Sequence, residues 1–320
     1  MSLYQKGVFV IKGLREFTKS GYQAASKSFV ESDLNKDASG LVFMITGANS
    51  GIGKAAAIAI AKKGGEVHMV CRSLDRANKA KDEIIDESKN QNVHVHILDM
   101  SQSGEVYKFA DSFSADHGKL NVLVNNAGCM VLERKLIGEV ETNFATNTLG
   151  TYILTKQLTP LLLRSEQPRV ITVSSGGMYI QKLNANDMQL SKLSPFDGEV
   201  SYAQQKRHQV ILTEELAKQH PNIHFSSMHP GWADTPAVQN SMPDFHRRMQ
   251  GKFRTPEEGA DTIVWLALSE AALKQPTGSF FLDRRPQSLH LPLAWTRESK
   301  QDRAKFLKEL DELAEKLKPK

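Results

Sequence analysis

The chain has 320 residues, 40% of them apolar, which is enough to bury a substantial core in one or two domains. Its 41 basic and 36 acidic residues give a mild net charge of +5, and no run of Lys and Arg with interleaved aromatic residues predicts binding to nucleic acid. Two cysteines form no disulfide framework, and no segment approaches the roughly 20 apolar residues that cross a bilayer. The composition therefore favours an intracellular protein with reduced thiols, cytoplasmic unless a targeting segment directs it elsewhere.

Residues 1–40 precede the first strand-like segment and form an N-terminal extension. Glu16 is the only acid in the first thirty residues, against the basic residues Lys6, Lys12, Arg15, Lys19 and Lys27. Apolar residues recur there at helical spacing, at Leu3, Tyr4, Val8, Ile11, Leu14 and Phe17. Such a helix either packs on its own domain, lies on an anionic membrane surface or begins an organelle-targeting segment. The pattern leaves these roles open, so peripheral membrane contact through residues 1–30 is one of the alternatives.

From residue 41 onward, strand-like and helix-like segments alternate with short connections. The predicted strands are 41–45, 66–71, 93–98, 120–124, 169–173, 223–228 and 278–282, and the predicted helices are 54–61, 77–88, 140–163, 200–218 and 298–318. This order predicts an α/β fold, a single doubly wound parallel-sheet (Rossmann-type) domain over residues 41–290 with helices on both faces. Residues 291–320 form a C-terminal tail whose apolar helix face either covers the domain or makes a homo-oligomer contact.

Polar and glycine residues gather where the predicted strands end. The first strand runs into a glycine-rich turn at 46–53, which opens the next helix and so aims backbone N–H groups at a phosphate. Glycine is favoured there because a Cβ would block the approach of a pyrophosphate. Asp99, Asn126, Ser175 and Pro230 follow the ends of later strands. Ligands of open α/β sheets bind at this carboxyl edge, so the pattern predicts a small-molecule site there.

Tyr202 and Lys206 lie four residues apart in a predicted helix and therefore share one face. A free tyrosine has a pKa near ~10, and a neighbouring positive charge favours its phenolate. Such a pair is suited to moving a proton near neutral pH.

In this order, the glycine spacing T-G-x-x-x-G-x-G and the Ser175, Tyr202 and Lys206 set resemble the short-chain dehydrogenase/reductase family over about residues 41–283. The resemblance implies that Tyr202 passes a proton to or from the substrate oxygen while Ser175 hydrogen-bonds that oxygen. It implies that Lys206 holds the nicotinamide ribose and lowers the tyrosine pKa, and that Asn147 anchors a water. The implied cofactor contacts are Gly47, Ser50, Gly51, Ile52, Gly53, Asp99, Asn126, Ala127, Gly128, Tyr202, Lys206, Pro230 and Thr235.

Two further segments bear on the substrate. Residues 178–199 are longer than the usual family connection between Ser175 and Tyr202, and residues 236–254 are expected to form an apolar flap opposite them. The longer connection alters the substrate entrance and does not itself indicate a substrate. The apolar flap residues Met242, Phe245, Met249 and Phe253 predict an apolar small-molecule substrate, although residues of this kind also pack on their own domain.

The end of the second strand predicts the cofactor. A protein that binds NAD usually places an acid there for the ribose 2′-hydroxyl, whereas this strand ends at Cys71 and is followed by Arg72. An arginine pairs with a 2′-phosphate, so NADP(H) is favoured and NAD(H) is the alternative. We expect an NAD(P)(H)-dependent oxidoreductase without a metal site; the alternative is a catalytically silent NAD(P)-binding sensor or scaffold.

Overall fold

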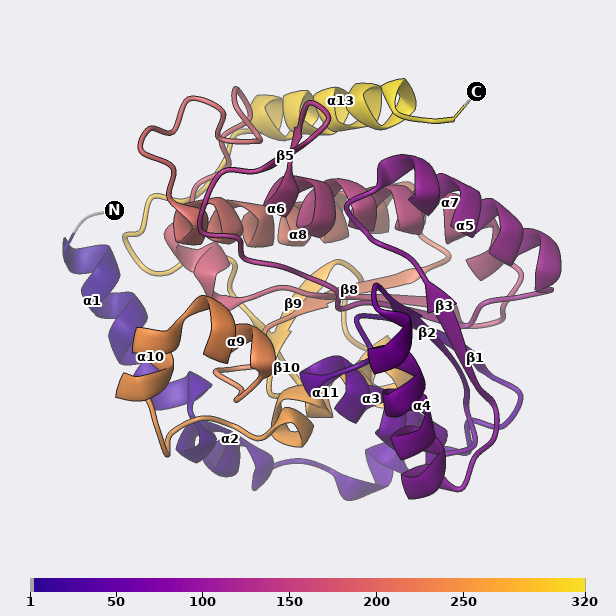
Figure 1. Cartoon of the computed structure of the whole chain (residues 1–320). Coiled ribbons are helices and arrows are strands. Elements are labelled where there is room, and N and C mark those ends of the chain that lie inside the picture. Colours follow the sequence, from indigo (N-terminus) through magenta and orange to yellow (C-terminus); the bar gives the residue numbers. More distant parts are fainter. Residues whose placement is uncertain (1–2, 320) are drawn as a thin grey trace.

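The computed structural model describes residues 3–319, and an eight-stranded sheet forms its centre (Figure 1). The strands are β1 (Val42–Thr46), β2 (Glu66–Cys71), β3 (Val93–Ile97), β4 (Val122–Asn125), β7 (Arg169–Val173), β8 (His224–Met228), β9 (Ser279–Leu282) and β10 (Arg285–Gln287). Their order is β10-β9-β8-β7-β4-β1-β2-β3, and every neighbouring pair is parallel except β9 with β10. The predicted fold class is confirmed, with one antiparallel edge strand that the sequence did not indicate.

Helices cover both faces of the sheet. One face carries α3 (Gly51–Ala61), α4 (Leu74–Ser88), α11 (Pro256–Leu268) and α12 (Glu270–Leu273), and the other carries α5 (Ser103–Asp116), α7 (Thr151–Leu162) and α8 (Gly198–Gln219). Strands covered on both sides are expected to be apolar throughout, and β1 and β7 are buried along their whole length. None of the helices within residues 3–319 is long and apolar enough to cross a membrane.

The predicted helical region over 140–163 is confirmed from Thr142 onward and is wrong only at residues 140 and 141, which form a strand. Residues 136–162 form a short hairpin of β5 (Leu136–Ile137) and β6 (Val140–Glu141), then α6 (Thr142–Phe144), a π-helical turn (Ala145–Gly150) and α7. The reason is a cap: the buried Glu141 carboxylate accepts the backbone N–H groups of Asn143 and Phe144, each at 2.9 Å. Carboxylates at that position start helices, so the helical segment begins after Glu141.

The N-terminal extension packs on the domain. It consists of α1 (Leu3–Lys12), a π-helical turn (Gly13–Phe17), α2 (Lys19–Ser26) and a 3-10 turn (Glu31–Leu34). Phe17 is completely buried in a cluster with Met178 and Tyr179, and its carbonyl accepts the Trp232 backbone N–H at 2.7 Å. Of the roles left open by the sequence, packing is therefore observed for this part of the extension.

Arg254 fixes the extension in place. Its buried guanidinium pairs with both Asp283 carboxylate oxygens at 2.6 and 2.9 Å, and its Nε donates to the Phe17 carbonyl at 3.1 Å. Gly231, with φ of +75°, passes so close that an added Cβ would lie 2.5 Å from the Arg254 Cδ. One buried arginine thus joins the extension to the loop after β8 and to the end of β9.

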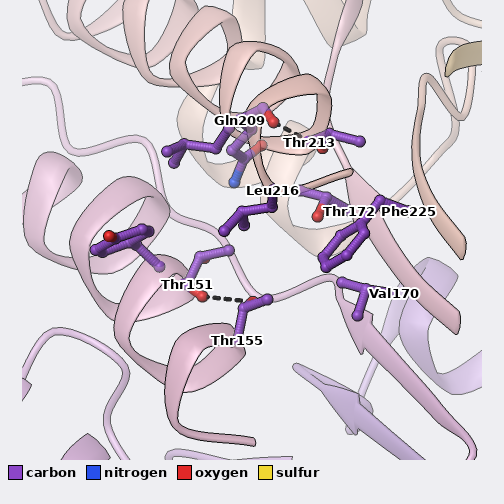
Figure 2. Close-up of a pocket in the computed structure, with 10 residues that line it drawn as sticks. Thr151, Thr155, Val170, Thr172, Gln209, Thr213, Leu216 and Phe225 are labelled. Atoms are coloured by element: carbon purple, nitrogen blue, oxygen red, sulfur yellow. Dashed lines mark hydrogen bonds between the residues drawn. The ribbon is translucent and has the colours of Figure 1, made fainter. Parts of the chain in front are cut away.

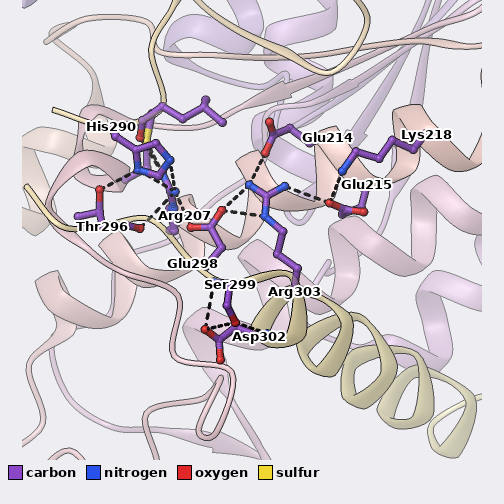
Figure 3. Close-up of polar contacts among 12 residues, drawn as sticks. Arg207, Glu214, Glu215, Lys218, His290, Thr296, Glu298, Ser299, Asp302 and Arg303 are labelled. Carbon is purple, nitrogen blue, oxygen red and sulfur yellow. Dashed lines mark hydrogen bonds and ion pairs between the residues drawn. The ribbon is translucent and has the colours of Figure 1, made fainter. Parts of the chain in front are cut away.

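The C-terminal tail is attached to α8. Its helix α13 (Lys300–Lys316) runs over α8 in Figure 1, and Phe306 stacks on His208 with ring centroids 4.5 Å apart. Figure 3 shows the polar contacts: the fully buried Arg207 pairs with Glu298 at 2.7 Å, and Arg303 pairs with Glu214 at 2.7 Å. The apolar face of α13 therefore covers the domain, which was one of its two predicted roles.

Candidate active site

The glycine turn after β1 has the shape of a phosphate cradle. Gly47 and Gly51 have φ values of +68° and +53°, which side chains rarely adopt, and the Gly47 N–H donates to the Val70 carbonyl at 2.8 Å. A Cβ on Gly53 would lie 2.5 Å from the Gly47 carbonyl oxygen and would also meet the Asn126 side chain. The turn therefore requires its glycines, and its position at the start of α3 is the one at which backbone N–H groups bind phosphates in proteins.

The turns after β4 and β8 meet this cradle. The Thr46 hydroxyl accepts the backbone N–H groups of Asn126 and Ala127 at 3.0 and 2.9 Å. On the other side, a Cβ on Gly51 would lie 3.1 Å from the Thr235 Cγ2. The predicted cofactor residues from three separate turns are thus brought together at one end of the sheet.

Ser50 and Ile52 occupy different surroundings within the turn. Ser50 precedes α3 in an extended conformation, and its side chain makes no capping hydrogen bond. Ile52 points toward α11, where its Cγ1 would lie 3.2 Å from a Cβ on Gly259. Ile52 therefore offers a backbone N–H to the cradle, while its side chain packs in the core.

The structure brings the predicted catalytic side chains together. Asp197 caps α8 by accepting the Val200 N–H at 3.0 Å, which sets Tyr202 on the first turns of that helix. A hydrogen bond from Ser175 favours the Tyr202 phenolate, and the Lys206 Nζ lies 5.3 Å from the Tyr202 ring centroid. Ser174 faces the other way, because its hydroxyl donates to the Lys206 carbonyl at 2.8 Å.

Burial has the largest effect on the pKa values of Tyr202 and Lys206. It raises the pKa of Tyr202 to about 12, although the Ser175 hydrogen bond acts in the opposite direction. It also lowers the pKa of Lys206 to about 7, because the ammonium is held among buried groups. The expected lowering of the tyrosine pKa by Lys206 is therefore not observed in this structure. The Lys206 Nζ instead donates to the Val173 carbonyl at 2.8 Å and to the Gln209 Oε1 at 3.0 Å.

Asn147 lies in the π-helical turn, a deviation that is common at functional sites. Its amide is fully engaged: Oδ1 accepts the Cys129 N–H at 2.9 Å, and Nδ2 donates to the Cys129 carbonyl at 2.8 Å and to the Gln205 Oε1 at 2.9 Å. A Cβ on Gly128 would lie 3.2 Å from the Asn147 Oδ1 and 3.6 Å from the Lys206 Nζ. Gly128 thus allows Asn147 and Lys206 to approach each other.

Gln205 and Gln209 complete this group, and the sequence analysis did not find them. Gln209 bonds Lys206 through its Oε1 and donates from Nε2 to the Asn147 carbonyl at 2.7 Å. Both glutamines lie one turn or less from Lys206 on α8, so helical spacing was the signal that could have pointed to them. Hydrogen bonds therefore connect the Lys206 Nζ to the Asn147 backbone carbonyl through the Gln209 side chain.

Figure 2 shows a pocket directly behind this network, between α7, α8 and the sheet. Gln209 lines it together with Thr151, Thr155, Thr172, Thr213 and the apolar residues Val170, Leu216 and Phe225. Two of the threonine hydroxyls are turned to helix carbonyls: Thr155 donates to the Thr151 carbonyl and Thr213 to the Gln209 carbonyl, each at 2.8 Å.

Asp99 and Arg72 lie at the predicted adenosine end of the site. The Asp99 carboxylate accepts the Ser101 N–H at 3.0 Å and the Ser101 hydroxyl at 2.7 Å, so a local turn uses at least one of its oxygens. Arg72 is exposed immediately after β2. Burial raises the pKa of Cys71 to about 11, while hydrogen bonds from the Ala48 and Asn49 backbone N–H groups and the Arg76 charge act in the opposite direction, so this strand end borders the cradle. Arg76 is a second cation here that the sequence analysis missed.

At the predicted nicotinamide end, the loop after β8 also contacts Arg254. The Pro230 carbonyl accepts from the Arg254 Nη1 at 3.4 Å, so part of this loop is occupied by the extension's anchor. The flap contains two short helices, α9 (Pro236–Ser241) and α10 (Pro243–Arg248). Met249 and Phe253 are each only 8% exposed, and Phe245 packs edge-on against Trp232 with centroids 5.2 Å apart. Much of the apolar character of the flap therefore serves packing.

The comparisons with known proteins agree with this geometry. The profile of the family described as short chain dehydrogenase matches residues 41–186. "Dehydrogenase/reductase SDR family member 12" from Homo sapiens is 56% identical over 316 residues, covering 98% of this chain and 99% of the relative. "Retinol dehydrogenase 12" from Mus musculus is 34% identical over 249 residues, covering 76% of this chain and 78% of that protein.

Solved structures show the same fold. A protein from Escherichia coli CFT073, assigned as a short chain dehydrogenase and complexed with NADPH, superposes with a TM-score of 0.63 at 21% identity, covering 80% of this chain and all of that one. A protein from Mycobacterium paratuberculosis gives a TM-score of 0.68 at 24% identity, covering 87% and 94%. Together with the near full-length similarity to family member 12, these matches confirm the predicted resemblance: the chain belongs to the short-chain dehydrogenase/reductase family.

Proposed function

We propose that the chain is an NADPH-preferring oxidoreductase that interconverts a carbonyl and an alcohol in an apolar small molecule. The observation that carries this proposal is the arrangement of Ser175, Tyr202 and Lys206 beside a glycine cradle at the carboxyl edge of the sheet. A sensor or scaffold needs the cradle but has no use for a buried proton-transfer group next to it.

In the proposed reaction a bound nicotinamide supplies or accepts the hydride at the carbonyl carbon. The Tyr202 hydroxyl delivers a proton to the carbonyl oxygen during reduction and removes it during oxidation. Ser175 donates a hydrogen bond to the same oxygen, which orients it toward Tyr202. The high pKa of Tyr202 keeps the phenol protonated at neutral pH, which suits its role as the acid in reduction.

The proposed preference for NADPH rests on the cations at the end of β2. Arg72 is exposed there, and Arg76 is close enough to act on the Cys71 thiol. No carboxylate follows β2 directly to bind a ribose 2′-hydroxyl or repel a 2′-phosphate. The Escherichia coli protein of the same fold was crystallised with NADPH, which supports the proposal.

A substrate screen tests the enzyme against its rival. NADPH oxidation would be followed with aldehydes, ketones and retinoids, the last because the names of several relatives refer to retinol. Tyr202→Phe removes only the hydroxyl, and general acid–base assistance is worth about 10²–10⁴-fold, so turnover should fall by that factor while NADPH still binds. Near-normal turnover by the variant would show that Tyr202 is not the proton-transfer group. A complete lack of turnover by the unmodified protein, alongside tight cofactor binding, would favour the sensor.

We also propose that α1 contacts an anionic membrane surface. Although one face of α1 packs on the domain, its residues Tyr4 and Ile11 are exposed by 50% and 69%, and Leu14 in the following π-helical turn is exposed by 44%. The loop 291–297 lies beside it, held by a hydrogen bond from Gln5 to the Ala294 carbonyl, and presents Trp295 with 83% exposure. Exposed Lys6 and Arg15 accompany these side chains. Apolar residues with an exposed tryptophan and flanking cations suit a lipid interface.

Flotation of the whole chain with vesicles tests this contact. The protein should float with phosphatidylserine-containing vesicles and less with neutral ones, and Ile11→Ser combined with Trp295→Ser should reduce the floated fraction. Leu163→Ser is the matched control, because Leu163 is an exposed leucine (46%) at the end of α7. Equal flotation of the double variant and the unmodified protein, or none by either, would rule the contact out.

A further inference from the structure

Four histidines and one glutamate gather on a part of the sheet that the active site does not use. They are Glu66 and His68 on β2, His94 and His96 on β3, and His117 directly after α5. Alternate residues of a strand point to the same face, and the parallel register places His68 opposite His94. The topology therefore brings side chains from three separate segments onto one face at the amino-terminal ends of β2 and β3.

The ligand atoms of this group are close together. A Glu66 carboxylate oxygen and ring nitrogens of His68 and His117 all lie within 4.8 Å of one another. The Glu66 Oε1 is 3.0 Å from the His68 Nε2 and 3.7 Å from the His94 Nε2. Zinc ligands bound at about 2.1 Å in a tetrahedron are about 3.4 Å apart. Small rotations of the partly exposed Glu66, His94 and His117 would therefore close the group around one ion.

The rings of His68 and His117 make the kind of hydrogen bonds that metal-binding histidines usually make. Such rings use one nitrogen for the ion and give the other to a hydrogen-bond partner. The Nδ1 of His117 lies 3.0 Å from the Phe113 carbonyl, which fixes the proton on Nδ1 and leaves Nε2 as a lone-pair donor. The Nδ1 of His68 lies 2.8 Å from the His96 Nε2, which can accept the His68 proton when the His68 Nε2 binds an ion.

The packing around the group adds rigidity and low polarity. His117 stacks on Phe113 with centroids 3.9 Å apart, and His68 meets the Phe113 ring edge-on at 5.0 Å. His68 is only 2% exposed, so an ion bound there would be held in surroundings of low polarity.

We propose that Glu66, His68 and His117, joined by His94, form a binding site for a zinc ion. Imidazole nitrogens with a single carboxylate favour zinc over magnesium or calcium, which prefer oxygen ligands. The ion would join the last turn of α5 to β2 and to β3, and β3 is the edge strand of the sheet. The site lies at the opposite end of β2 from Cys71 and Arg72, so its role is to stabilise the edge of the domain.

The sequence analysis predicts no metal site, and the reason is the spacing. The ligands come from positions 66, 68, 94 and 117, and only His94 and His96 form a short repeat that could have drawn notice. No family spacing of the kind found in zinc fingers connects them. The pairing of β2 with β3 and the end of α5 create the cluster.

Zinc titration of the full chain tests the proposal, with a chromophoric chelator as competitor and thermal unfolding as a second measurement. The unmodified protein should bind one zinc ion and unfold at a higher temperature when zinc is in excess. Glu66→Gln and His117→Gln each remove one ligand at a partly exposed position, so both variants should fold. Each should weaken zinc binding by about 100-fold or more, since loss of even an outer-shell partner costs about 10–100-fold.

His220→Gln is the matched control, because His220 is a partly exposed histidine at the end of α8, outside the cluster. It should leave zinc affinity and the zinc-dependent shift in unfolding temperature unchanged. Binding that is too weak to compete with the chelator, or binding that Glu66→Gln and His117→Gln leave intact, would overturn the proposal. The second result would point to Cys71 or Cys129, and alkylation of the thiols would identify it.

Discussion

The two halves of the carboxyl edge are built in different ways. At β1, β2 and β4 the cofactor half is shaped by backbone: glycines at positive φ and a threonine hydroxyl that accepts two neighbouring N–H groups. At β7, β8 and β9 the substrate half is shaped by buried side chains from distant segments. Arg254 joins Phe17 to Asp283 there, and Phe17 meets His229 edge-on at 4.4 Å.

The two halves therefore depend on different interactions for their stability. The cradle needs little more than a tight turn, so a few glycines within eight residues specify it. The substrate half depends on a charged pair that has been removed from water, and such a pair is stable only while both partners are present. Because these interactions are separate, a substitution that disrupts one half should leave the other half intact.

The largest effect is expected from Arg254→Met. The substitution leaves the Asp283 carboxylate buried without its partner and frees the carbonyls of residues 16–18. Loss of one partner of a buried pair costs about 3–5 kcal/mol, so the free energy of unfolding in urea should fall by that amount. Arg247→Met is the control, because its partner Asp244 is exposed, and it should change little. Equal effects of the two substitutions would show that the N-terminal anchor does not stabilise the domain.

Gly53→Ala tests the cofactor half. The added methyl group would lie 2.5 Å from the Gly47 carbonyl oxygen, so the cradle must open to accept it. Overpacking of this kind costs about 1–3 kcal/mol, and if binding has to overcome that cost, NADPH affinity measured by calorimetry should fall by about 5- to 150-fold. Gly104→Ala is the control, since a Cβ there would have its nearest neighbour at 3.7 Å. Unchanged NADPH affinity in Gly53→Ala would mean that this turn does not hold the pyrophosphate.

The same contrast explains what the sequence could predict. The strands were found because apolar runs mark buried parallel strands, and the predicted 66–71 and 169–173 agree with β2 and β7. The glycine turn and the Ser175, Tyr202 and Lys206 set were found because each is defined by local spacing or by family order.

The residues that were missed depend on contacts between distant segments. Arg254 and Asp283 are ordinary charged residues in the sequence, and only the folded chain shows that they are buried together. The same is true of Arg207 with Glu298, which attaches the C-terminal tail beside Lys206. The expected lowering of the Tyr202 pKa failed for a related reason, because spacing reveals which groups are neighbours but not how deeply they are buried.

A smaller effect is expected from Arg72→Ala. If Arg72 pairs with a ribose 2′-phosphate, its removal should weaken NADPH binding by about 10-fold and leave NADH binding nearly unchanged, since a hydrogen bond to a charged group is worth about 1.5 kcal/mol or more. Calorimetry with both cofactors would measure this. Arg76→Ala should have a weaker effect of the same kind, and Lys79→Ala, one turn further along α4, should have none. Equal affinities of the unmodified protein for NADPH and NADH would show that it does not prefer NADPH.

The smallest expected effect is a fraction of a proton taken up when the cofactor binds. Burial lowers the pKa of Lys206 from 10.5 to about 7, so at pH 8 most of the population is neutral in the cofactor-free protein. The phosphates of a bound dinucleotide favour the charged form and raise that pKa, so binding at pH 8 should draw a proton from the buffer. At pH 6 the lysine is already protonated and the uptake should vanish. Calorimetry in two buffers with different ionisation enthalpies measures the uptake, and Lys206→Arg should abolish it because the guanidinium does not titrate. A binding enthalpy at pH 8 that is the same in both buffers would show that Lys206 keeps its charge without the cofactor.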